Sequence, residues 1–179
     1  MEKGKILTLI AGIFLIFTTF MVSWFSVASV NAYGIGLIKN LPEMFGNAES
    51  IAISWGSDVP TFAIYIVAVC YIVFLLSGVI ILLGIFLNGI KSRIVAIIGA
   101  IMPILLSFAI LFGSLDLPPN LLVYVNVFLD PEPIVEGFIP LSVNVGPTNG
   151  TVIVKLGTYL LLGSGILGLI SGILPREEI

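Results

Sequence analysis

The chain has 179 residues, of which 59% are hydrophobic and only 9% are charged, and its formal net charge is −3. Because a soluble domain carries about a quarter of its residues as charged side chains, this composition and the mean hydropathy of +1.22 exclude an ordinary soluble protein and indicate a membrane protein. Cys70 is the single cysteine and histidine is absent. An internal disulfide is therefore excluded, the commonest ligand of haem, zinc and copper is missing, and we expect no cofactor.

Four apolar segments predict four transmembrane helices, at about residues 6–24, 61–87, 94–115 and 156–174. A helix rises about 1.5 Å per residue, so roughly 20 apolar residues cross the hydrocarbon core of a bilayer. The first segment follows basic residues and also resembles a secretory signal peptide, but its apolar core is longer than is usual for one. We therefore expect it to remain in the protein as a transmembrane helix.

The second segment is longer than the membrane is thick, so we expect it to tilt or protrude, and Pro103 in the third segment predicts a kink. Only residues 88–93 separate these two segments, which must therefore form an antiparallel hairpin. The two long connections, residues 25–60 and 116–155, then share one side of the membrane, and both termini share the other.

The basic residues predict the orientation of the helices. The side that holds the termini carries five basic and three acidic residues, whereas the side that holds the long loops carries two basic residues, Lys39 and Lys155, and seven acidic ones. Basic residues are enriched in cytoplasmic loops. We therefore expect a multi-pass protein of the cell membrane, with both termini in the cytoplasm and both long loops extracytoplasmic.

The two long loops contain segments that are typical of strands. In residues 122–128 and 141–145, successive side chains alternate between two faces, as in a strand. The sequence GPTNG separates residues 141–145 from residues 151–156 and predicts a turn, so these two segments are expected to form a hairpin. In the first loop, residues 50–55 alternate in the same way, and residues 24–31 are a weaker candidate. We predict a four-helix membrane bundle in one domain, with a small sheet of four or five strands, built from both loops, resting on the helix ends.

Few residues are suited to chemistry inside the membrane. Ionisable residues within a span usually mark a transport pathway, but the four apolar cores contain none, and only Lys155 and Asp116 approach them. A pore lined by backbone and hydroxyl groups in an oligomer is still compatible with the sequence. No phosphate-binding loop or hydrolase serine motif is present, and without histidine a nucleophile lacks its common base, so we expect no enzyme.

Small residues on the fourth segment predict a close-packing face. Ser164, Gly168 and Gly172 repeat every four residues, a spacing that lets helix backbones approach each other in lipid. This face has two interpretations: it packs against the other helices of the same chain, or it docks another subunit.

Two candidate sites lie in the second long loop. Asp130, Glu132 and Glu136, interleaved with prolines, could supply oxygen ligands to a metal ion such as calcium, or form an acidic turn in solvent. Asn149 begins an Asn-Gly-Thr sequence on the predicted outer side, so it is a candidate for glycosylation.

Four aromatic residues, Trp24, Phe25, Tyr33 and Trp55, fall where the helix ends meet the outer membrane interface. Aromatic rings with a polar edge are enriched at that depth. We expect Trp24 to anchor there, whereas Trp55 is expected either to anchor in the same way or to fill the small sheet.

Four helices, cytoplasmic termini, a short inner loop and two outer loops that form a sheet resemble the claudin-type tetraspan layout over the whole chain. That family carries a Trp-Gly-Leu-Trp motif followed by a disulfide-forming pair of cysteines. Trp55 and Gly56 are the partial match here, and Cys70 lies elsewhere. The resemblance therefore implies the four-helix layout with a sheet. The motif that goes with the family's role at cell junctions is missing, so the resemblance does not imply that role.

We expect a non-enzymatic structural or accessory membrane protein that acts by lateral association and extracytoplasmic contacts. Its expected partners are the lipid bilayer and a second copy or another membrane protein, with no nucleic acid. The alternatives are an oligomeric channel or small-solute transporter, and a lipid-modifying enzyme that uses Asp116 or Asp130. The absence of glutamine and near absence of thermolabile cysteine favour a heat-adapted prokaryotic source.

Overall fold

Four long helices dominate the computed structural model, which describes residues 2–27, 30–55, 60–113, 144–148 and 152–175. They are α1 (Lys3–Met21), α4 (Thr61–Leu83), α5 (Gly89–Gly113) and α7 (Leu156–Ile173). Each is long and apolar enough to cross a membrane, as predicted from the sequence. The chain is therefore an integral membrane protein with four spans.

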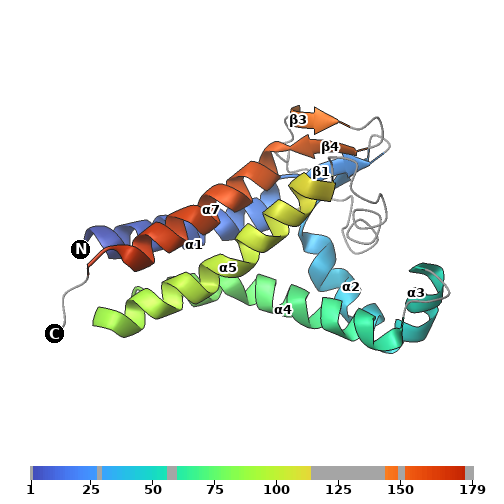
Figure 1. Ribbon diagram of the computed structural model, residues 1–179, viewed down its shortest axis with the longest axis horizontal. Coiled ribbons are helices and arrows are strands. Elements are labelled where there is room, and N and C mark those ends of the chain that lie inside the picture. The colour runs from blue at the N-terminus through green and yellow to red at the C-terminus, as the bar shows by residue number, and fades with distance from the viewer. Residues whose placement is uncertain (1, 28–29, 56–59, 114–143, 149–151, 176–179) are drawn as a thin grey trace.

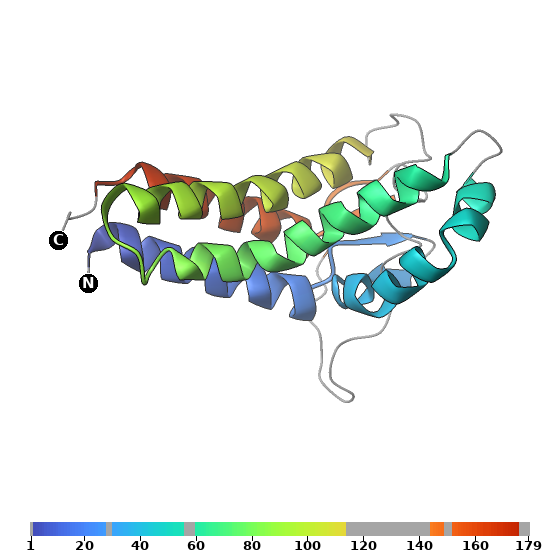
Figure 2. The same ribbon diagram turned by 90° about the horizontal axis from the view of Figure 1, so that it is seen from below.

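The four helices run side by side in an elongated bundle, and α1 begins at the end where α7 finishes (Figure 1). We call this the termini end, and we call the opposite end, where the strands lie, the sheet end (Figure 2). Contacts join α1 to α4, α4 to α5, α5 to α7 and α7 to α1. Each helix therefore packs against two neighbours, and the chain crosses the bundle four times as predicted.

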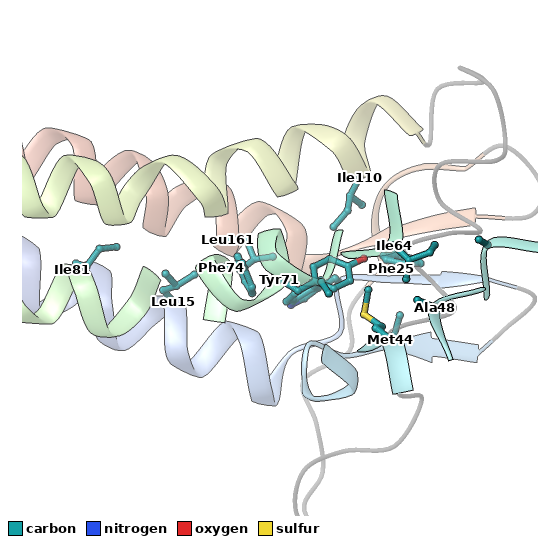
Figure 3. Packing of buried hydrophobic residues seen from close by; sticks show 14 of the residues in the cluster. Leu15, Phe25, Met44, Ala48, Ile64, Tyr71, Phe74, Ile81, Ile110 and Leu161 are labelled. Carbon is teal, nitrogen blue, oxygen red and sulfur yellow. The ribbon is translucent and has the colours of Figure 1, made fainter. Parts of the chain in front are cut away.

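Large apolar side chains fill the centre of the bundle. Leu15, Phe74, Ile81 and Leu161 are at most 2% exposed and lie between the helices (Figure 3). The outward faces carry exposed apolar residues, among them Ile10, Ile13 and Phe14 on α1, Val69, Val73 and Leu76 on α4, Ile94, Ile98 and Ile101 on α5, and Ile166 and Ile170 on α7. Apolar surface on every side of a bundle is what contact with lipid requires.

The turn between α4 and α5 is tighter than predicted. α4 ends at Leu83 rather than near residue 87, and the N–H groups of three successive residues, 84 to 86, donate to carbonyl oxygens one turn back. Gly89 has a φ of 53°, a conformation that glycine adopts at no steric cost, and α5 begins there rather than at residue 94. α5 is continuous through Pro103, where the kink stays a prediction.

A four-stranded antiparallel sheet lies at the sheet end. Its strands are β1 (Phe25–Val27), β2 (Val30–Ala32), β3 (Asn144–Thr148) and β4 (Val152–Lys155), in the order β2-β1-β4-β3. Phe25 of β1 lies opposite Ala32 of β2 on one side and Val154 of β4 on the other. Because β1 and β2 come from the first long loop and β3 and β4 from the second, one small sheet built from both loops is confirmed.

The strand predicted at residues 50–55 is wrong, because these residues belong to helix α3 (Ala48–Trp55). Ala48 and Ala52, one helical turn apart, are buried in the core, whereas Ile53 is exposed. The alternation of isoleucines suggested a strand, but small residues spaced by one turn fit closely against α4, which α3 contacts. Helix α2 (Ile35–Gly46), which precedes α3, was not predicted.

Two other strand boundaries differ from the prediction. Residues 24–31 do not form a single strand, since β1 and the start of β2 both fall within them and pair as a hairpin. β3 runs on through Pro147 to Thr148, so the first three residues of the GPTNG sequence belong to the strand rather than to the predicted turn. β3 is an edge strand, where the missing N–H of a proline is tolerated. The strand predicted at residues 122–128 lies outside the described residues.

Gly99 lets α5 approach the backbone of α4. A Cβ atom at Gly99 would lie 2.9 Å from the carbonyl oxygen of Ser77 and 3.0 Å from the backbone nitrogen of Ile81. Both atoms belong to the α4 backbone, so a larger residue at position 99 must push the two helices apart. Gly163 on α7 is a matched control, because a Cβ atom there would meet nothing within 4 Å.

We expect Gly99→Ala to lower the free energy of unfolding by about 1–3 kcal/mol, the usual cost of overpacking a core. Gly163→Ala should leave it unchanged or raise it slightly, because alanine has the higher helix propensity. Thermal unfolding of both variants in the same mild detergent measures the difference. Equal stability of the two variants would contradict the close backbone contact between α4 and α5.

Candidate functional site

The main chain between α1 and β1 joins the bundle to the sheet. The N–H of Trp24 donates to the carbonyl oxygen of Ala32 at 2.9 Å, and the carbonyl oxygen of Trp24 accepts the N–H of Lys155 at 2.9 Å. The same oxygen accepts the hydroxyl of Thr158 at 2.6 Å, and the N–H of Gly157 donates to the carbonyl of Ser23 at 3.0 Å. This segment therefore binds β2, β4 and the first turn of α7 at once.

The side chain of Trp24 is buried and connects the same segment to α1 and α4. It is 0% exposed, and its indole Nε1–H donates to the carbonyl oxygen of Thr18 at 3.1 Å. Its ring meets Phe74 of α4 edge to face, with ring centroids 5.5 Å apart. We call Trp24, with the residues that hydrogen-bond to it and to Ser23, the Trp24 junction. The junction links α1, α4, α7 and the sheet.

Two glycines make room for the indole. A Cβ atom at Gly34 would lie 2.5 Å from the Trp24 ring and 2.6 Å from the carbonyl oxygen of Thr19. A Cβ atom at Gly157 would overlap the carbonyl oxygen of Ser23 and lie 2.9 Å from the indole. Any other residue at either position would displace the ring or the backbone beside it. Nothing in the local sequence around either glycine points to Trp24, so sequence reasoning missed both.

The aromatic residues expected at the membrane interface are placed differently by the structure. Trp24 and Phe25 are 0% exposed and Tyr33 is 2% exposed, so all three are covered by protein rather than by lipid headgroups. The anchoring role predicted for Trp24 is therefore wrong, because the glycines beside it admit the ring to the interior. The side chain of Trp55 lies outside the described residues.

Apolar side chains fill the space beneath the sheet. Phe25, Met44, Ala48 and Ile64 come from β1, α2, α3 and α4 and lie close together (Figure 3). Burial raises the pKa of the neighbouring Tyr33 phenol above its usual value, an effect that a hydrogen bond from Asn31 partly opposes. Tyr33 is therefore uncharged at neutral pH, and the core between sheet and helices carries no charge from it.

Lys155 ends β4 at the start of α7 and is only 7% exposed. Its position at the sheet end of the last span agrees with its place in the sequence. The other candidate residues of the second loop, Asp116, Asp130, Glu132, Glu136 and Asn149, lie outside the described residues, and their roles stay predictions. Within residues 2–27, 30–55, 60–113, 144–148 and 152–175, no group of three His, Cys, Asp or Glu residues is placed to hold a metal ion.

The small residues of α7 face α5. Ser164, Gly168 and Gly172 are all buried. A Cβ atom at Gly168 would lie 2.9 Å from the Cβ atom of Ala100, and one at Gly172 would overlap the side chain of Ile97. In the structure this face is therefore occupied by the chain's own helix. A second subunit could reach it only by displacing α5.

Basic side chains hold the helix ends together at the termini end. The guanidinium of Arg93 on α5 donates to the carbonyl oxygens of Gly172 at 2.8 Å and Ile173 at 3.1 Å, which end α7. A cation at a helix C-terminus also opposes the negative end of the helix dipole. The Nζ atom of Lys5 donates to the side-chain oxygen of Asn88 at 2.8 Å, which joins α1 to the α4–α5 turn.

No known protein-family description, curated protein sequence or solved structure matches this chain. The function must therefore be inferred from the geometry itself. Its best-defined feature is the Trp24 junction, which fixes a sheet to the end of a four-span bundle. The junction holds the sheet in place through main-chain and side-chain hydrogen bonds to Ser23 and Trp24.

We expect Trp24→Phe to lower the free energy of unfolding by about 1–3 kcal/mol, because it leaves the buried carbonyl of Thr18 without the indole donor while keeping an aromatic ring against Phe74. Tyr65→Phe, which removes a polar atom from an aromatic residue that is 41% exposed, is the matched control and should change little. Thermal unfolding in detergent compares them, and an unchanged Trp24→Phe variant would show that the indole hydrogen bond does not hold the junction.

Proposed function

We propose that the protein is a non-enzymatic structural or accessory component of the membrane, which acts through lateral association and through contacts of its sheet end. The observation that carries this proposal is the Trp24 junction. Because the sheet is hydrogen-bonded to the end of α1 and the start of α7, it stands at a fixed position on the bundle. A rigid surface on a membrane-embedded base is suited to binding a partner.

The polar groups of the spans support a structural role. Thr8 and Thr19 of α1 donate to carbonyl oxygens one turn back at 2.8 Å, and Ser164 and Ser171 of α7 each donate to a carbonyl three residues back at 2.7 Å. The hydroxyl oxygens of Thr8 and Ser171 also lie within hydrogen-bond distance of each other, 3.2 Å apart across the α1–α7 contact. These hydroxyls satisfy hydrogen bonds within and between helices, as lipid surroundings require.

A channel or small-solute transporter is less well supported. Leu15, Phe74, Ile81 and Leu161 fill the centre of the described bundle, so a path through one copy would need these side chains to move. A pore between copies would instead be lined by the outward faces, whose described exposed residues in the four spans are apolar apart from Lys3, Tyr65, Cys70 and Lys91. The claudin-type layout adds a similarity of architecture, and we do not extend the proposal to a junctional role.

We expect lateral association to use the outward helix faces, because α5 already covers the small-residue face of α7. Protein extracted from native membranes in mild detergent after brief crosslinking should then run larger than its 19.1 kDa monomer, or carry a copurified membrane protein. An unrelated four-span protein from the same membranes is the control for non-specific crosslinking. A monomer with no partner in both detergent and lipid nanodiscs would contradict the proposal.

Liposome reconstitution separates the two functions. If the protein is structural, the flux of ions and small solutes should equal that of protein-free liposomes. Flux above that background, from protein that is folded and inserted, would favour the channel.

We also propose that the termini end is cytoplasmic and the sheet end extracytoplasmic, as the distribution of basic residues predicts. Ser50 on α3 and Asn88 in the α4–α5 turn are exposed residues at the two ends. In a Cys70→Ala background, Ser50→Cys should react with a membrane-impermeant maleimide in intact cells, whereas Asn88→Cys should react only after permeabilisation. The opposite pattern would invert the orientation.

A further inference from the structure

Protein covers only part of the apolar face of α2. Met44 is fully buried, and Leu41 packs against the edge of the core. Ile38 and Phe45 lie seven residues apart, which is two helical turns, and are 47% and 46% exposed. Glu43 is two residues from Phe45, so it lies on the far side of the helix, where it is exposed. α2 is thus amphipathic, with one part of its apolar face against the bundle and another part uncovered.

The uncovered part of α2 continues the lipid-facing surface of α4. The ring of Phe45 stacks on that of Tyr65 in α4, with centroids 6.1 Å apart and planes 19° from parallel. Tyr65 is itself exposed and belongs to an outward apolar stripe that includes Phe62, Ile66 and Val69. The views in Figures 1 and 2 both place α2 beside α4 at the sheet end. The two exposed surfaces therefore form one apolar patch.

The position of Tyr65 indicates how deep the apolar patch lies in the membrane. Tyr65 is in the second turn of α4, about 6 Å along the axis from its first residue at a rise of about 1.5 Å per residue. Tyrosine is enriched where the hydrocarbon core meets the headgroups, because its ring is apolar and its hydroxyl polar. Phe45, which stacks on this ring, lies at the same depth. Glu43, on the opposite side of α2, then faces away from the hydrocarbon.

We propose that α2 lies in the membrane interface at the sheet end, with Ile38 and Phe45 in contact with lipid and Glu43 in water. The partner of this surface is the bilayer itself. Lipid is favoured over a second protein subunit because the patch is continuous with the surface of a membrane span and because α2 carries a polar side opposite it. Through Met44, which is buried beside Ile64, α2 then sets the depth of the bundle and of the sheet above it.

The test measures lipid exposure directly at three positions of the full chain. In a Cys70→Ala background, Ile38→Cys, Phe45→Cys and Glu43→Cys each receive a nitroxide spin label, and the protein is placed in nanodiscs of phosphatidylcholine and phosphatidylglycerol. Power saturation with oxygen, which concentrates in lipid, and with a water-soluble nickel chelate gives the exposure of each label. We expect the oxygen-to-nickel accessibility ratio to be several-fold higher at positions 38 and 45 than at position 43.

Three outcomes would overturn the proposal. Low oxygen-to-nickel ratios at all three positions, with high accessibility to nickel, would place the uncovered face of α2 in water, and high ratios at all three would place Glu43 in lipid. Low accessibility to both reagents at positions 38 and 45 would show that protein, such as a second copy, covers the patch. Ile38 is away from the Phe45–Tyr65 stack, so Ile38→Cys carries the test if Phe45→Cys fails to assemble. The result is independent of the proposed function, because a protein with any partner or activity can lie at this depth.

Discussion

The hydrogen bonds of the chain that leaves α1 are the constraint on which the sheet end depends. Where a span ends, its backbone groups pass from lipid toward water and must be satisfied by the protein or by solvent. Ser23 and Trp24 satisfy theirs with β2, β4 and the start of α7, all in the interior. The buried indole then adds a hydrogen bond back to α1. Because these partners come from both ends of the chain, the sheet and bundle form one unit.

Packing within the bundle follows a different rule. Lipid tails are as apolar as the helix surfaces, so the hydrophobic effect does not drive helices together within a bilayer. Close packing and hydrogen bonds between helices must stabilise the bundle instead. Gly99 brings α5 to the backbone of α4, and Gly168 and Gly172 bring α7 to α5. Arg93 then binds the end of α7, so the basic residues from which we infer orientation also stabilise the bundle.

Most of the features that the sequence predicted are those that one segment determines by itself, and the sheet built from both loops is the exception. The length of each apolar run was enough to locate four spans. Two other features that need distant partners were mispredicted. The burial of Trp24 depends on Gly34 and Gly157, and the helix at residues 48–55 depends on Ala48 and Ala52 meeting α4. At residues 50–55 the alternating isoleucines are typical of a strand, but contacts with the rest of the protein stabilise a helix there instead.

Helix α2 was not predicted, although Ile38, Leu41 and Phe45 have a helical spacing, and only the structure separates the part that faces protein from the part left uncovered. If the uncovered part rests in lipid, the height of the sheet above the bilayer is set by α2 from outside and by the Trp24 junction from inside. A protein that transports a solute must let its helices shift, whereas one that presents a surface to a partner gains from holding that surface at constant height. The fixed sheet therefore favours presentation over transport.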